Sequence, residues 1–147
     1  MTEKLLSLPH SFEGARKLVD RLRSLKGCPW DREQTAKTLA PMLVEECHEL
    51  VEAIENGDVR ETIEELGDVI FHIAFQLHIG VSKDIFSDEI VFSKLIEKYI
   101  RRHPHVFDGK KAETKEELIE NWEAIKRAEK EGMRKSALDG IPPSLPA

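Results

Sequence analysis

Five acidic side chains stand at helical spacing in two neighbouring stretches of the chain, and their type and spacing suit the binding of a metal ion. Glu45, Glu46 and Glu49 occupy one predicted helical turn, and Glu65 and Asp68 occupy one turn of the next predicted helix. Residues three or four positions apart share one face of a helix. Carboxylate oxygens suit hard Mg²⁺ or Mn²⁺ better than zinc, and Mg²⁺ commonly shares its ligands with substrate phosphates. The pattern therefore predicts a magnesium site for phosphate-ester or anhydride chemistry.

These acids lie on or beside the apolar stripes of their predicted helices. Leu43 and Leu50 flank Glu46 at helical spacing, and Val69 follows Glu65 by four residues. A buried carboxylate without compensation costs several kcal/mol, so convergence of all five on a helix pair requires a cation. The alternative is that they are solvated acids on charged helix faces. The chain would then be a non-catalytic, acidic helical interaction domain that binds basic partners.

A di-iron carboxylate bundle is a third interpretation of the same region. Such bundles carry a Glu-x-x-His motif on each of two helices. Glu45 and His48 form one such pair, but neither His72 nor His78 has an acid three residues before it. The missing second pair disfavours the di-iron interpretation.

Apolar residues recur at helical spacing almost throughout the chain, and no alternating strand pattern competes with them. Asp58 and Thr114, each followed by a glutamate three residues on, are typical of helix starts. Gly57 and Gly132 are typical of helix ends. We expect loops over 26–30 and 101–111. The sequence predicts an all-α bundle of about five helices, over approximately residues 11–25, 39–55, 58–80, 87–100 and 114–132.

The length of 147 residues suits one domain. We predict a helical domain over residues 1–132 and an irregular, proline-rich tail over 133–147. Hydrophobic residues make up 40% of the chain, which is below the globular average. A homodimer or larger even assembly is therefore expected to complete the core.

Charge and cysteine content exclude several other classes. The chain has 22 basic and 28 acidic residues and no basic tract, so nucleic-acid binding is not expected. No apolar run has membrane-spanning length, and the first residues do not form a secretory signal. Cys28 and Cys47 are expected to be reduced thiols of a cytoplasmic protein.

The pattern Glu45-Glu46-x-x-Glu49, a spacer, and Glu65-x-x-Asp68 resembles the metal signature of the MazG and all-α nucleotide pyrophosphohydrolase superfamily. Further segments, which together extend from residue 27 to residue 142, resemble MazG itself. These segments are 27–31 with 33–35, 101–107, 121–123 with 125–126, and 136–142.

The resemblance implies hydrolysis of nucleoside or deoxynucleoside triphosphates to the monophosphate and pyrophosphate, by water attack at the α-phosphorus. It implies that Glu46, Glu49, Glu65 and Asp68 ligate Mg²⁺, with Mn²⁺ as a substitute. Glu46 is thereby also a catalytic candidate, together with Glu45. Three roles stay open for Glu45: binding a further metal, orienting water, or accepting the proton of water. The family resemblance also implies a homodimer or larger even assembly.

Three residues in or just after the predicted loop over 26–30 are candidates for contacts with the nucleoside. Trp30 either stacks on a nucleobase or anchors the loop in the core. Asp31 and Gln34 either bind base edges or cap the following helix.

Three basic residues are candidates for contacts with the phosphates of the substrate. Arg101 and Arg102 offer forked guanidinium donors, and Lys126 offers a point-charged ammonium group. The alternative is that all three are solvated charges at helix ends.

Overall fold

The computed structural model describes residues 7–138, with side chains to residue 134, and this part of the chain is helical without any strand. It divides into two compact units at the boundary between Ile90 and Val91. The five predicted long helices are present, and two short helices begin in the predicted loops. The helices are α1 (Phe12–Leu22), α2 (Pro29–Glu33), α3 (Ala36–Asn56), α4 (Val59–Ser82), α5 (Asp88–Arg102), α6 (Pro104–Phe107) and α7 (Lys115–Leu138).

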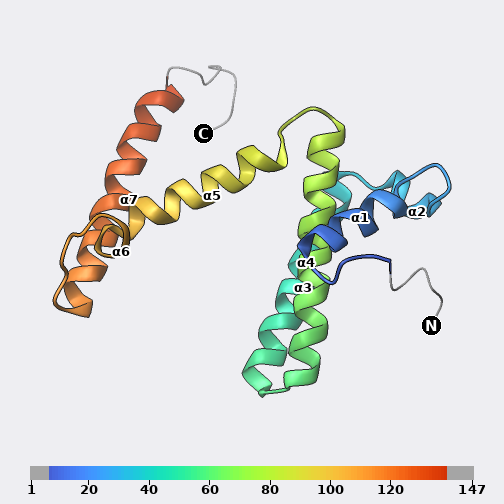
Figure 1. Cartoon of the computed structure of the whole chain (residues 1–147), viewed down its shortest axis with the longest axis horizontal. Helices are drawn as coiled ribbons and strands as arrows, with labels where there is room; N and C mark the ends of the chain where they lie inside the picture. Colours follow the sequence, from blue (N-terminus) through green and yellow to red (C-terminus); the bar gives the residue numbers. More distant parts are fainter. Residues whose placement is uncertain (1–6, 139–147) are drawn as a thin grey trace. The chain divides into compact units, whose positions relative to one another are not determined.

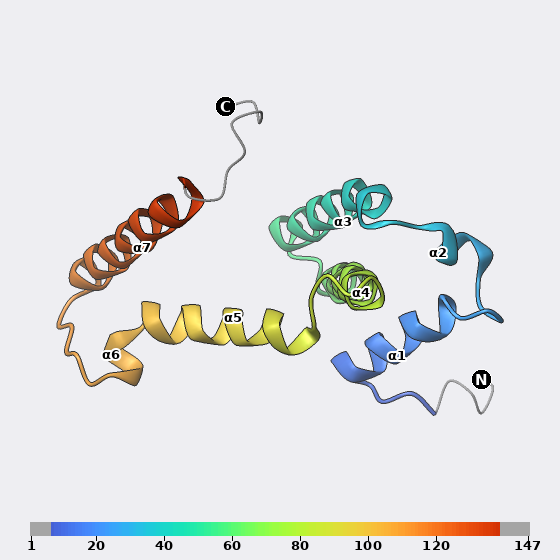
Figure 2. The ribbon, with the colours of Figure 1, turned by 90° about the horizontal axis from the view of Figure 1, so that it is seen from above.

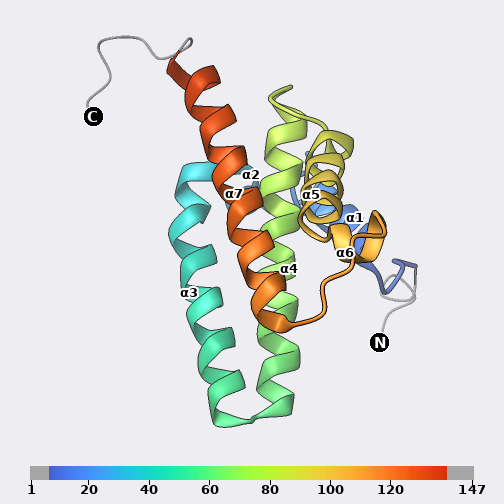
Figure 3. The same cartoon turned by 90° about the vertical axis from the view of Figure 1, so that its left-hand side faces the viewer.

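An antiparallel hairpin of α3 and α4 is the centre of the first unit (Figures 1 and 3). Gly57 ends α3 in the left-handed region with φ of 69°, which glycine adopts without steric cost. The Asp58 carboxylate then accepts a hydrogen bond of 3.1 Å from the Glu61 amide and caps α4. This tight turn brings the two acidic stretches to neighbouring positions on facing helices, as predicted.

Helix α4 lies between α3 and α1 in the view from above (Figure 2). The core of the unit forms where these helices meet. Burying an aliphatic or aromatic side chain of this kind contributes about 1.5–3 kcal/mol, which holds the hairpin in one register. Its buried members are Val19, Leu39, Ala74, Phe75 and Ile79.

The short helix α2 corrects the prediction of a loop between the first two helices. Pro29 begins α2, where its fixed φ and missing amide hydrogen are tolerated. Arg23 donates to the carbonyl oxygens of Asp31 at 2.7 Å and Gln34 at 2.9 Å. Its guanidinium carbon lies 5.3 Å from the centre of the Phe75 ring. Arg23 therefore ties α2 to the core by hydrogen bonds and a cation–π contact.

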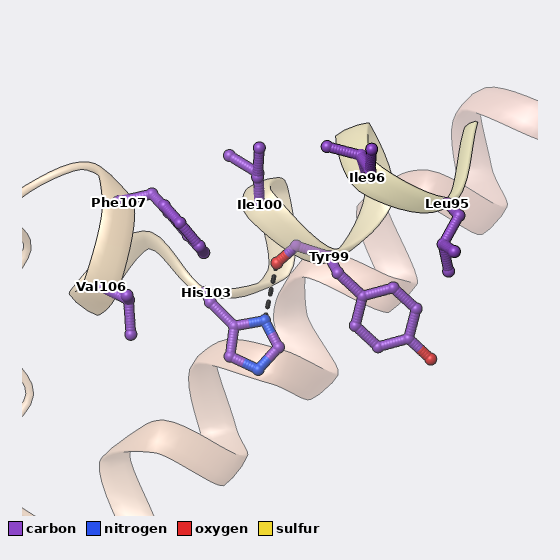
Figure 4. A pocket seen from close by; sticks show the side chains of 7 residues that line it. All are labelled: Leu95, Ile96, Tyr99, Ile100, His103, Val106 and Phe107. Carbon is purple, nitrogen blue, oxygen red and sulfur yellow. Dashed lines mark hydrogen bonds between the residues drawn. The ribbon is translucent and has the colours of Figure 1, made fainter. Parts of the chain in front are cut away.

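The second unit is held by side chains between α5, α6 and α7. Within it, an apolar pocket of about 590 Å³ is lined by residues of α5 and α6 (Figure 4). His103 Nδ1 donates to the Tyr99 carbonyl oxygen at 2.6 Å and so fixes the chain between these two helices. The pocket is lined by Leu95, Ile96, Tyr99, Ile100, His103, Val106 and Phe107.

Helix α7 corrects the predicted boundary at Gly132, because it continues through this residue to Leu138. A glycine in an exposed helix interior costs only about 1 kcal/mol relative to alanine, so it does not by itself end the helix. The predicted irregular tail therefore cannot begin at residue 133, and residues 139–147 lie outside the described part. Within that part, none of the helices combines the length and the apolar character that crossing a bilayer requires.

Candidate metal centre and substrate site

The α3–α4 hairpin brings three of the predicted carboxylates together. Glu46, Glu49 and Glu65 each offer an oxygen, and these oxygens all lie within 4.8 Å of one another. Opposite oxygen ligands of one Mg²⁺ ion are about 4 Å apart. Glu46 and Glu65 are half-buried, whereas Glu49 is exposed. We call these three residues the carboxylate cluster.

Glu65 is the member of the carboxylate cluster whose surroundings oppose a negative charge most strongly. Burial raises the pKa of its carboxyl group, and the charges of Glu49, Asp68 and Glu46 raise this pKa further. Its Oε2 atom is buried and has no hydrogen-bond partner among the described residues. An unpaired buried oxygen beside other carboxylates fits a cation, which would satisfy the oxygen and reverse the repulsion.

The structure brings together only three of the five acids that were expected to converge. Asp68 is exposed and stands outside the 4.8 Å set, although its charge is close enough to raise the pKa of Glu65. Glu45 is also exposed and outside the set. Successive residues of a helix are rotated by about 100°, so the face that presents Glu46 does not present Glu45.

The nucleoside candidates lie on and just after α2. Trp30 is 50% exposed, so the interpretation as a core anchor is wrong and its ring is accessible. Asp31 is 8% exposed, and Thr35 rather than Asp31 caps α3, so the capping interpretation is wrong for Asp31. The Gln34 side chain donates to the Trp30 carbonyl oxygen at 3.0 Å and accepts from the Thr38 hydroxyl at 2.9 Å. Gln34 therefore connects α2 to the start of α3 by two hydrogen bonds.

The two arginine candidates share one carboxylate in the second unit. Arg101 Nε and Arg102 Nη2 each donate to Glu129 at 2.8 Å. The hydrogen bond from Arg102, followed by that from Arg101, lowers the pKa of Glu129 to about 2. The Arg102 guanidinium also lies 5.5 Å from the Trp122 ring centre. Only 16% of the Arg102 side chain is exposed, against 52% of Arg101.

These contacts test whether the two arginines are solvated charges at helix ends. Arg102 is a largely buried side chain, paired with Glu129, that links α5 to α7, so it is not a solvated charge. Arg101 uses its Nε atom on Glu129 and keeps half of its side chain in solvent. Lys126 lies 3.7 Å from Glu123, one turn earlier on α7. Sequence reasoning missed Glu129, because nothing in the spacing of α7 distinguishes it from the other acids of that helix.

The fold and the carboxylate cluster define an all-α protein with a candidate metal centre on a helix hairpin. Comparison with known proteins identifies the family of this all-α chain. The family model described as the MazG nucleotide pyrophosphohydrolase domain matches residues 34–107, which include both acidic stretches. The chain belongs to the MazG family.

Several relatives are similar over most of this chain. Uncharacterized protein YabN of Bacillus subtilis is 43% identical over 145 residues, which cover 99% of this chain and 29% of YabN. The nucleoside triphosphate pyrophosphohydrolase/pyrophosphatase MazG of Thermotoga maritima is 41% identical over 92% of this chain and 52% of its own length. The nucleoside triphosphate pyrophosphohydrolase of Escherichia coli K12 is 40% identical, over 88% and 50% respectively. The chain thus spans about half or less of these curated relatives.

A solved structure supports the fold independently. The crystal structure of a mazG-related protein from Thermotoga maritima matches with a TM-score of 0.66 and 29% sequence identity. The match covers 78% of this chain and 98% of that protein.

Proposed function

We propose that this chain hydrolyses nucleoside triphosphates to the monophosphate and pyrophosphate, with Mg²⁺ or Mn²⁺ held by the carboxylate cluster. The observation that carries the proposal is the buried, unpartnered Oε2 of Glu65 beside Glu46 and Glu49, in a chain of the MazG family. The printed names of several relatives, all longer than this chain, give the reaction class.

The residues divide the chemistry as follows. Glu46, Glu49 and Glu65 hold the ion, and Asp68 joins them when its side chain turns toward Glu65. When bound, Mg²⁺ neutralises phosphate charge and lowers the pKa of a water molecule for attack at the α-phosphorus. Glu45, exposed beside Glu46, stays a candidate for a second ion, for orienting water, or for accepting its proton.

Substrate contacts are assigned to the candidates that the structure leaves accessible. Trp30 presents an exposed ring on which a nucleobase can stack. Arg101 and Lys126 keep partly exposed cationic groups for phosphate oxygens. The predicted roles of Asp31, Gln34 and Arg102 in direct binding are weaker proposals, because Asp31 and Arg102 are largely buried and the Gln34 amide is already paired.

Two other functions are less well supported. A non-catalytic acidic interaction domain requires its acids to face solvent, whereas Glu46 and Glu65 are half-buried and the Oε2 atom of Glu65 is buried. A di-iron bundle requires histidine ligands, but the carboxylate cluster contains no histidine, and His48 is exposed outside it.

The reaction itself is tested with a panel of nucleoside triphosphates, Mg²⁺ and ¹⁸O-labelled water. We expect monophosphate and pyrophosphate as products, with the label in the monophosphate, because attack at the α-phosphorus places the oxygen of water there. Mass spectrometry of the products is the measurement. Label in pyrophosphate would move the attack to the β-phosphorus, and formation of nucleoside diphosphate and orthophosphate would refute the proposed reaction.

We further propose that the chain forms a homodimer, or a larger even assembly, through the exposed apolar face of the α3–α4 hairpin. Monomeric proteins seldom expose large contiguous apolar patches, so a helix pair with this many exposed aliphatic side chains favours burial against a second copy. The exposed side chains are Val44, Val51, Ile54, Val59, Ile63, Leu66, Ile70 and Ile73.

Light scattering on the purified chain tests this assembly. We expect a dimer or larger even species at micromolar concentration, and we expect Ile63→Glu with Ile70→Glu to give a monomer, because a charge opposes burial of either position. The matched control is Ile119→Glu, at an exposed position of α7. A monomeric wild-type chain that retains activity would contradict the proposal.

A further inference from the structure

Two buried side-chain atoms lack a hydrogen-bond partner among the described residues, Glu65 Oε2 and His72 Nδ1. Both belong to α4, and they are seven residues, about two turns, apart on one face of the helix. His72 is only 8% exposed. Leaving a buried polar group unpaired destabilises a fold, so its presence calls for an explanation.

Helix geometry shows where His72 lies relative to the carboxylate cluster. Seven residues before it, Glu65 meets Glu46 and Glu49 of α3. Four residues after it, Gln76 donates to the Ala36 carbonyl oxygen of α3 at 3.0 Å. The face of α4 that carries His72 is therefore turned toward α3.

The direction of the His72 side chain follows from the same geometry. Side chains of a helix lean toward its N-terminus, over the preceding turn. The residue four positions earlier is Asp68, so the imidazole leans toward the turn that carries this carboxylate. Asp68 is the predicted ligand that stands outside the carboxylate cluster, and its side chain is exposed.

Other histidines of this chain show that an unpaired Nδ1 is not the rule. His78 Nδ1 donates to Asp20 Oδ1 at 2.6 Å, and His103 Nδ1 donates to the Tyr99 carbonyl oxygen at 2.6 Å. The His72 ring makes an edge contact with Phe71, with 5.8 Å between ring centres, which supports packing but leaves its nitrogen unsatisfied. A purely structural role in the core would be served equally well by an apolar side chain.

We propose that His72 is a positioning residue whose Nδ1–H donates to the Asp68 carboxylate and holds it toward Glu46, Glu49 and Glu65. This inference rests on the proposed metal centre. A hydrogen bond to a ligating carboxylate fixes its orientation, and loss of such a partner typically weakens metal binding by 10–100-fold. His72 would thereby give the exposed Asp68 carboxylate a defined direction as a ligand.

Metal binding to the full chain tests the proposal without relying on activity. Mg²⁺ and Mn²⁺ affinities are measured by calorimetry for the wild type, His72→Leu and His72→Asn, together with the melting temperature of each metal-free protein. We expect His72→Leu to weaken binding about 10–100-fold without lowering the metal-free melting temperature, because it removes an unpaired buried nitrogen. His72→Asn should recover most of the affinity, since its amide nitrogen takes the place of Nδ1.

The control is His48→Leu, which changes an exposed histidine of α3 and should leave the affinity unchanged. If His72→Leu does not fold, His72→Asn is compared with His72→Gln, whose amide takes the place of Nε2; the proposal requires Asn to bind the ion more tightly. Equal affinity of the wild type and His72→Leu, or of Asn and Gln, overturns this inference alone. A wild-type chain that binds neither ion overturns the proposed metal centre as well.

Discussion

Glu46→Ala is expected to lower the rate of nucleoside triphosphate hydrolysis by at least about a hundredfold at saturating Mg²⁺. Each factor of ten in rate corresponds to about 1.4 kcal/mol of activation free energy, and a placed metal ion supplies several kcal/mol. Glu46 is half-buried and its carboxylate oxygen belongs to the carboxylate cluster, so Glu46→Ala removes one of the proposed ligands of the ion. Initial rates with product separation give the measurement.

The control for this variant is Glu52→Ala, an exposed acid on the same helix that stands outside the carboxylate cluster. It changes the net charge by the same amount and should retain a rate close to that of the wild type. Glu49→Gln should behave as Glu46→Ala does, because it removes the charge of a proposed ligand while keeping the shape of the side chain. Comparable rates for Glu46→Ala and Glu52→Ala would contradict the assignment of the metal centre.

The long helices and the pairing of the acidic stretches could be predicted from local signals. The spacing of apolar residues predicted the helices. The turn between α3 and α4 was predicted from Gly57, which ends α3, and from Asp58, which caps α4. Because the turn is tight, it determines which residues of α3 and α4 face each other. Glu46 and Glu49 are thereby placed near Glu65. These are properties of adjacent residues, which a sequence records directly.

The misplaced boundaries have a different physical origin. Helix α2 is a single turn held by Arg23, which comes from outside the turn and depends on the fold for its position. Gly132 lies within α7 although glycine often ends helices, because propensity is a weak preference at any one position. Where such a helix begins or ends depends on tertiary contacts and on the helix propensities of many residues together. Neither can be read from a short motif.

The finer geometry of the candidate site also depends on three-dimensional contacts. Spacing placed Glu45 and Asp68 with the other acids, but spacing does not report the direction of a side chain or the burial of a single oxygen. The pairing of Arg101 and Arg102 with Glu129 joins residues 27 or 28 positions apart on different helices. Only the fold distinguishes Arg102, whose side chain is 16% exposed, from Arg101, whose side chain is 52% exposed.

Mg²⁺ is expected to raise the melting temperature of the wild type near neutral pH, and Glu65→Gln is expected to abolish most of this rise. The pKa of Glu65 is raised above its ordinary value of 4.5 in the folded, metal-free chain. Because folding raises this pKa, the contribution of the Glu65 carboxyl group to the stability of the fold is complete below the pKa that it has in the unfolded chain. It is lost as the pH rises through the folded pKa, where the carboxylate becomes charged beside Glu49 and Asp68. The metal-free protein should therefore melt at a lower temperature at neutral than at mildly acidic pH.

A cation bound above this pH range restores the lost stability, since it binds the folded chain and neutralises the repulsion. An ion at 100 times its dissociation constant stabilises the fold by about 2.7 kcal/mol, which corresponds to roughly 5–10 °C for a chain of this size. Thermal melts from mild acid to neutral pH, with and without Mg²⁺, give the measurement. Glu65→Gln should flatten the metal-free pH dependence, while Glu61→Gln, an exposed acid one turn earlier on α4, should change neither curve. An undiminished Mg²⁺-dependent rise in Glu65→Gln would show that the ion binds elsewhere.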